Sequence, residues 1–285
     1  MRFIVPILLI LFIFSSCSAP KKRPGDLILK DANKKMERGI KGFNKRSFER
    51  AEKDFYKALE SYILLDNREG QASVYLNLGS LYLMQARLEK ALPLFKKAFD
   101  ISLELNNQPL RIDALTSMAR LYLLKGELSK AREAISQGLE LSNKVQLERR
   151  KATLLNHSGN LKIKEGDYIG AEKILRESLS LNEKLDNPAG KSANYFNLGL
   201  VNLATGNHKE ADIYFNKALT LDKRMEKPDL IARDLEKLGD VSKIIGQKEE
   251  AASYYKRSIQ IYQQLKDNKG LKRLSQKNKD IGKQN

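Results

Sequence analysis

The sequence of 285 residues contains no tryptophan, one cysteine, two histidines and seven prolines. A single cysteine excludes a disulfide bridge within the chain. The histidines, His157 and His208, are not in the His-Glu-x-x-His spacing of a zinc site, and no second cysteine could join them. The sequence also lacks a Gly-x-Ser-x-Gly nucleophile elbow and a glycine-rich phosphate loop. We therefore expect no enzyme activity, no metal and no cofactor.

Strand signals and long apolar runs are also missing. No segment alternates apolar and polar residues for long enough to predict a β-strand. The apolar run at residues 3–14 has twelve residues, whereas a helix that spans a bilayer needs about 20. Because Arg2 provides a basic start, this run fits the hydrophobic segment of a signal peptide, which we place at residues 1–16.

The chain is strongly basic, with 52 Lys and Arg against 35 Asp and Glu and a formal charge of +17. Such an excess suggests an anionic surface nearby, either a membrane or a cell wall. A solvated, lysine-rich exterior on long helices explains the same composition. We do not expect nucleic acid as a partner, because the first segment predicts export.

The most informative feature is a period of forty residues, which is held through six copies. Alanine recurs at Ala51, Ala91, Ala131, Ala171, Ala211 and Ala251. A small residue recurs twelve positions earlier, at Gly39, Gly79, Ala119, Gly159, Gly199 and Gly239. A bulky apolar residue recurs four positions later, at Phe55, Phe95, Ile135, Leu175, Phe215 and Tyr255. A fixed period of this length predicts a stacked array of helical repeats.

The residue types at these positions fit two helices in close contact. Small residues such as Gly79 and Ala91 let two backbones approach, because protein interiors are densely packed. Large apolar residues such as Phe95 fill the space beside them. Glycine follows the first helix in four copies and can end a helix with a positive φ: Gly126, Gly166, Gly206 and Gly246. One such hairpin cannot bury its own apolar face, so it needs neighbours.

This pattern resembles the tetratricopeptide repeat. Gly79, Tyr82, Ala91, Phe95 and Ala98 match its signature in order, and the resemblance covers residues 31–265. The period of forty exceeds the usual thirty-four, so longer helices are expected. The resemblance implies an all-α solenoid, a right-handed superhelix of six forty-residue hairpins with a C-terminal capping helix.

The predicted organisation has four parts. A signal peptide covers residues 1–16, and a flexible tether covers residues 17–28. Six repeats occupy residues 29–268, divided as 29–68, 69–108, 109–148, 149–188, 189–228 and 229–268. A capping helix and a basic tail follow at residues 269–285.

The only cysteine follows two small residues, Ser15 and Ser16, at the end of the apolar run. This arrangement resembles the lipobox of bacterial lipoproteins, although Phe14 stands where that motif more often has leucine. The resemblance implies that Cys17 becomes the first mature residue and carries the lipid, including palmitate. Ser18 is compatible with sorting to the outer membrane, on the side that faces the periplasm. The alternative is an ordinary signal peptide or an uncleaved anchor.

The resemblance also implies that the first helix of each repeat lines a concave groove. Aligned on the small residue, these helices carry a polar strip that we predict to bind a partner: Asn77, Ser117, Arg120, Asn156, His157, Asn160 and Asn197. An asparagine amide offers both a donor and an acceptor to a peptide backbone. Arg120 could hold a carboxylate through two hydrogen bonds. The alternative is a polar helix face that is merely solvated.

These features predict a non-catalytic scaffold or adaptor of the bacterial cell envelope, held to a membrane by a lipid at Cys17. Its partner would be an unidentified envelope protein or peptide segment, with no small-molecule substrate. By resemblance, such lipoproteins assist pilus or secretin assembly, outer-membrane protein insertion, or control of cell-wall hydrolases. The alternative function is direct binding of an anionic cell-wall glycan or lipid by the basic surface.

Overall fold

The computed structural model describes the backbone of residues 24–282 and the side chains up to residue 279. The signal peptide, Cys17 and the first part of the tether lie outside these residues. The described part contains thirteen helices and no strand, which confirms the all-α prediction. The helices are α1 (Pro24–Asn44), α2 (Phe48–Leu64), α3 (Arg68–Met84), α4 (Leu88–Glu104), α5 (Gln108–Lys125), α6 (Leu128–Lys144), α7 (Glu148–Glu165), α8 (Tyr168–Lys184), α9 (Pro188–Ala204), α10 (His208–Arg224), α11 (Pro228–Ile244), α12 (Lys248–Gln264) and α13 (Asn268–Gly282).

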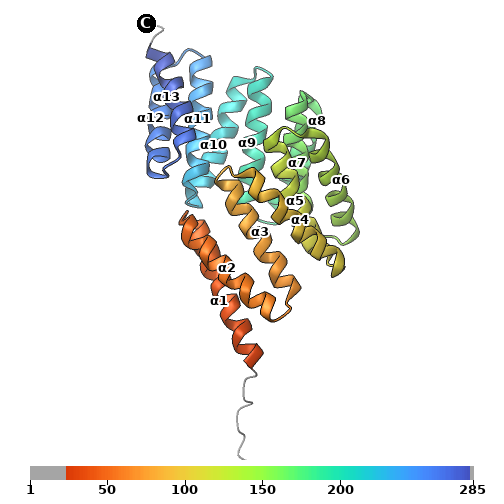
Figure 1. Ribbon diagram of the computed structural model, residues 1–285. Coiled ribbons are helices and arrows are strands. Elements are labelled where there is room, and N and C mark those ends of the chain that lie inside the picture. The colour runs from red at the N-terminus through yellow and green to blue at the C-terminus, as the bar shows by residue number, and fades with distance from the viewer. Residues whose placement is uncertain (1–23, 283–285) are drawn as a thin grey trace, which may run out of the picture.

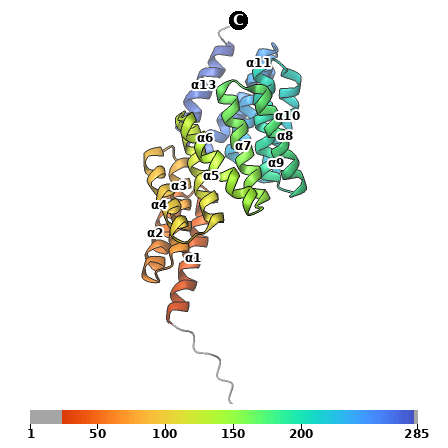
Figure 2. The same cartoon turned by 90° about the vertical axis from the view of Figure 1, so that its right-hand side faces the viewer.

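The helices pack as successive hairpins that form a curved solenoid (Figures 1 and 2). Each odd-numbered helix from α1 to α11 packs most extensively on the helix that follows it. The odd-numbered helices α1, α3, α5, α7 and α9 also contact one another in sequence, whereas the even-numbered helices make no comparable contacts among themselves. The odd-numbered helices therefore line the inner side of the curve, which we call the hollow.

The turns explain why the period is forty. A left-handed backbone conformation recurs every twentieth residue, for example at Asp66, Ala86 and Asn106. The N–H of the next residue then donates to a carbonyl five residues back, as from Asn67 to Tyr62 over 2.8 Å. This bond satisfies a carbonyl that the helix end leaves free. A helix of 17 residues and a turn of three thus make half a repeat.

The start of α1 corrects one predicted boundary. The helix begins at Pro24, so residues 24–28, which were assigned to the flexible tether, are helical. Proline suits the first turn of a helix because its missing N–H would have no partner there. Asp26 in the same turn favours the positive end of the helix dipole. These local signals start the helix before the predicted first repeat.

The core confirms the packing predicted from the period. The six recurring alanines are fully buried, and so are Phe55, Phe95 and Phe215. A Cβ atom added to Gly79 would overlap the ring of Phe95 on the partner helix. The same overlap would occur between Gly199 and Phe215. In five of the six hairpins, a ring or branched side chain therefore occupies the space where a Cβ would be. In the third hairpin, Ala119 stands in place of the glycine.

None of the helices described between residues 24 and 282 is long and apolar enough to cross a membrane.

We predict that Gly79→Ala lowers the free energy of unfolding by about 1–3 kcal/mol, because the Phe95 ring must move. Gly25→Ala is the matched control, since its new Cβ would have only Leu65 Cδ2 near it, at 3.8 Å. The control should be neutral or stabilising by up to about 1 kcal/mol, because alanine is the better helix former. Urea unfolding of both variants measures the difference. Equal midpoints for the two variants would contradict this packing.

Candidate functional site

The hollow is enclosed because the solenoid curves until its two ends meet. Arg46, in the turn between α1 and α2, lies with Nη1 3.6 Å from Oδ2 of Asp229 at the start of α11. Figure 1 shows the end of this first hairpin beside the ends of α10 and α11. Arg120 on α5 is close enough to Asp229 and Arg233 on α11 for their charges to affect it. Helices far apart in sequence therefore face one another across the hollow.

The structure places the predicted polar strip on the inner helices, but its side chains differ in their hydrogen-bond partners. Asn77 Nδ2 donates to the carbonyl of Ser73 over 2.8 Å, and Ser117 Oγ donates to the carbonyl of Asp113 over 2.9 Å. Both side chains are half-buried. These bonds stay within one helix, so neither residue connects two hairpins.

Three asparagines join α7 to α9. Asn197 Nδ2 donates to Asn156 Oδ1 over 3.0 Å, and Asn160 Nδ2 approaches Asn197 Oδ1 at 3.5 Å. Asn197 is almost fully buried, with 6% of its surface exposed. Because unpaired buried amides are costly, these contacts stabilise the junction of two neighbouring hairpins. Asn160 has the longest of these contacts and is only half-buried, whereas the Asn156 Nδ2 donor is buried without a partner among the described residues.

Arg120 is the cation of the strip that has no carboxylate partner among the described residues. Its nearest side-chain partner is Met84 Sδ, 3.9 Å from Nη2. Its surface is exposed to water, yet desolvation by the enclosing protein lowers the pKa of Arg120. The charge of Asp229 opposes this shift and that of Arg233 adds to it. The side chain therefore carries a positive charge inside the hollow that no described carboxylate pairs with directly.

His157 lies close to Arg120. Burial lowers the pKa of His157 to about 4, and the charge of Arg120 contributes to the shift. The imidazole is therefore neutral at pH 7 and offers one donor and one acceptor. Arg120, His157 and Asn160 together make a polar surface that fits a carboxylate or a peptide group.

The sequence analysis missed two ion-pair clusters that involve the inner helices, one around Arg150 and one around Arg233. Arg150 on α7 forms a two-pronged pair with Asp113 on α5, at 2.7 and 2.8 Å. The Arg233 guanidinium carbon lies 3.5 Å from the centre of the Phe196 ring, which is within cation–π range. Asp113 and Arg233 both stand six positions before the small residue of their repeat. Extending the aligned register toward the helix starts would have shown that they share the inner face.

Arg233 also contacts two fully buried carboxyls. Its Nη2 lies 3.2 Å from Asp234 Oδ1 and 3.7 Å from Asp222 Oδ2. Ser192 Oγ donates to Asp222 Oδ1 over 2.6 Å. Burial raises the pKa of both carboxyls, that of Asp234 to about 8, and the Arg233 charge only partly opposes this. One guanidinium cannot balance two buried carboxylates, so the pair holds a proton at neutral pH.

The described residues contain no group of three or more His, Cys, Asp or Glu side chains that could hold a metal ion. The buried acid pair is enclosed between α9, α10 and α11, and its charge partner is already in place. We therefore assign it to the packing of these helices.

Comparison with known proteins identifies the repeat. The family model of the MalT-like TPR region matches residues 42–237, and that of the tetratricopeptide repeat matches residues 235–267. The chain belongs to the tetratricopeptide repeat family. The resemblance inferred from the forty-residue period is thus confirmed. A search of curated proteins finds no match.

Solved structures share the fold at low identity. BtubC from P. vanneervenii has 19% identity and a TM-score of 0.57, with 86% of this chain and 93% of that chain covered. A Rap protein complexed with competence and sporulation factor has 14% identity and a TM-score of 0.66, with 89% and 75% covered. Aspartyl phosphate phosphatase F from Bacillus subtilis has 13% identity and a TM-score of 0.62, with 90% and 71% covered. At these identities the likeness concerns the fold alone.

The buried acid pair predicts a pH-dependent stability. The native pKa of Asp234 lies above its ordinary value of 3.8. The stability that the protonated carboxyl contributes to the folded state is therefore fully present below about pH 4 and is lost as the pH rises toward 8. Asp234→Asn removes the charge, so we expect it to be more stable than the wild type at pH 8 and similar at pH 4. Each pKa unit corresponds to about 1.4 kcal/mol, so at pH 8 the free energy of unfolding of the variant should exceed that of the wild type by several kcal/mol.

Thermal melts from pH 4 to pH 8 measure this difference. The control is Asp186→Asn, because the Asp186 side chain is 95% exposed and its charge stays in water. The control should show no comparable pH-dependent gain. An Asp234→Asn variant that is less stable than the wild type at both ends of the range would show that the carboxyl is ionised in the native state.

Proposed function

We propose that this tetratricopeptide repeat protein is a lipid-anchored scaffold or adaptor of the bacterial cell envelope. It binds an extended segment of a partner protein in the hollow and performs no catalysis itself. Membership of the family supports a role in protein–protein interaction. The observation that carries the proposal is Arg120, a cation enclosed in the hollow without a carboxylate partner among the residues described.

The chemistry of the hollow favours a particular kind of partner segment. Arg120 would bind a carboxylate, either the end of a chain or an acidic side chain, in a two-pronged contact. Neutral His157 and the weakly engaged amide of Asn160 would bind peptide groups beside it. Asn156 and Asn197 act indirectly, by joining the two helices that carry these groups. Asn77 and Ser117, bonded to their own helices, extend the polar surface.

The anchor rests on the sequence around Cys17. We place the protein at the outer membrane, facing the periplasm, with a lipid on this cysteine. The second candidate is direct binding of an anionic glycan or lipid by the basic surface, which the formal charge of +17 favours. Binding through exposed charges weakens steeply with salt, because separated charges in water are screened. Co-sedimentation with purified cell wall at two salt concentrations distinguishes this candidate from a peptide in the hollow.

We predict that a photo-crosslinking residue at position 160 captures one dominant protein in cells, because this position faces the hollow. The same residue at position 173, on the exposed side of α8, is the control and should capture none. Arg120→Glu should abolish the product, since it replaces the cation by a like charge, whereas Arg120→Lys should retain part of it. Equal products from positions 160 and 173 would contradict binding in the hollow.

We predict that labelled palmitate is incorporated into the wild-type protein and that Cys17→Ala abolishes both the label and membrane attachment. The physical reason is that each buried methylene contributes about 0.8 kcal/mol to membrane binding. Ser18→Ala is the control, because it leaves the thiol in place. A Cys17→Ala protein that stays in the membrane fraction would refute the lipid anchor without bearing on the hollow.

A further inference from the structure

A cavity of about 510 Å³ lies where the two ends of the solenoid meet. We call it the seam pocket. Three turns line it: the one between α1 and α2, the one between α3 and α4, and the one between α12 and α13. The side chains that matter for its chemistry are Arg46, Phe48, Met84, Lys266, Lys269 and Arg273. This volume is typical of small-molecule sites.

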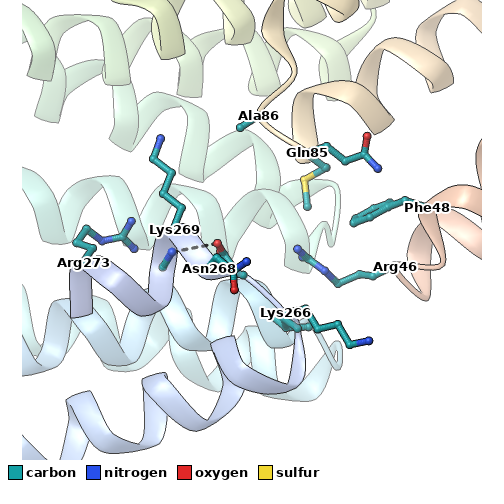
Figure 3. Close-up of a pocket in the computed structure, with 12 residues that line it drawn as sticks. Arg46, Phe48, Gln85, Ala86, Lys266, Asn268, Lys269 and Arg273 are labelled. Carbon is teal, nitrogen blue, oxygen red and sulfur yellow. Dashed lines mark hydrogen bonds between the residues drawn. The ribbon is translucent and has the colours of Figure 1, made fainter. Parts of the chain in front are cut away.

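Arg46 extends into the space between the two ends (Figure 3). It comes from the first hairpin, and its guanidinium points toward Asn268 on the opposite side. The guanidinium carbon lies 5.4 Å from the centre of the Phe48 ring. This ring and Met84 give the pocket an apolar wall beside the charge.

Two donors of Arg46 have no acceptor. Nε and Nη1 are buried, and neither forms a hydrogen bond within the described part of the chain. Asp229 Oδ2 lies 3.6 Å from Nη1, which is beyond hydrogen-bond distance. Buried polar groups in native proteins are nearly always bonded, so the Arg46 guanidinium has hydrogen-bonding capacity that this chain does not use.

The backbone at Arg46 has a conformation that glycine occupies in four equivalent turns. Its φ is 57°, in the left-handed region that glycine adopts most readily. The equivalent turns of the third to sixth hairpins all have glycine there: Gly126, Gly166, Gly206 and Gly246. In the first two hairpins the position is Arg46 and Ala86, and both residues line the seam pocket. The fold alone would be served better by glycine.

The charges around the pocket are only partly balanced, since Asp229 lies beside Arg46 but not within hydrogen-bond distance. Lys266 and Lys269 form no ion pair with any residue that the structure describes. Arg273 is paired with Glu236, at 2.6 Å. Asp267 is the one carboxylate of the lining, and its Oδ1 already accepts the Gly270 N–H over 3.0 Å. The pocket therefore presents several cationic donors and little negative charge.

We propose that the seam pocket binds a small ligand through a phosphate group, with Arg46 as its main contact. A phosphate has more acceptor oxygens than a carboxylate, and it matches the planar fork of a guanidinium flanked by lysines. Phe48 and Met84 accommodate the organic part of the ligand. Because the lining comes from both ends of the chain, the bound phosphate joins the first two hairpins to the turn after α12. The seam pocket adjoins the hollow, since Met84 of its lining lies 3.9 Å from Arg120, but Arg46 and the phosphate probes test it separately from the partner segment.

Calorimetric titration of the full chain in detergent with inorganic pyrophosphate and with glycerol 3-phosphate tests the proposal. Arg46→Gln should weaken binding at least tenfold. Lys173→Gln removes the same charge at an exposed site on α8 and should change the affinity less than twofold. Arg46→Gly controls for folding, because glycine adopts the turn readily: this variant should melt normally without ligand and gain no thermal stability from pyrophosphate.

Vesicles identify the source of the phosphate. If the site takes a lipid headgroup, the chain binds phosphatidylglycerol vesicles more than phosphatidylcholine vesicles, Arg46→Gln removes the preference, and the soluble probes bind weakly. If the site takes a free phosphate compound, the soluble probes bind and the vesicle preference is the same in Arg46→Gln and Lys173→Gln. Binding that falls equally in these two variants, or no binding of any of these probes, overturns the proposal.

Discussion

The close approach of two helices at a residue without a side chain is the contact on which the whole structure depends. Where Gly79 meets the ring of Phe95, no Cβ fits between the backbone and the ring. The same contact recurs every forty residues, with Ala119 in place of glycine in the third hairpin, so each hairpin has nearly the same shape as the one before it. A stack of equal units bends by a constant amount at each step, so the packing inside each hairpin produces the curvature of the whole solenoid.

Side chains on the inner side of the curve lie neither in the packed core nor on an open surface. Arg120 is exposed to water, yet the protein around it lowers its pKa, because the inner helices surround it. His157 is held neutral in the same space. Charges in such an enclosed position interact more strongly than on an open face, where solvent screens them. Most of the inner cations are balanced by nearby carboxylates, as Arg150 is by Asp113. The cations without such a partner, Arg120 and the lysines of the seam pocket, are among those on which the two proposed sites rest.

The inner polar residues divide into those that hold the solenoid together and those that remain available. Asn197 is buried between two hairpins and bonds to Asn156, so its role is structural even though its position is that of a groove residue. The buried pair of Asp222 and Asp234 joins α10 and α11 through Arg233. Polar character at an aligned position therefore does not by itself identify a binding residue, since neighbouring repeats use the same positions to contact one another.

The sequence by itself determined the repeat, its period and the packing inside each hairpin, because these depend on contacts between residues fewer than about twenty positions apart. Phe95 against Gly79 and the left-handed turns follow from local spacing. Only the tertiary structure decided that Arg46 meets Asp229 and that the turn after α12 closes a pocket with the first two hairpins. Those contacts depend on small rotations summed over five hairpin junctions, and no local pattern encodes that sum. For the same reason, the sequence could assign the polar strip to the first helices of the repeats, but could not tell which of its side chains bond to each other across two hairpins.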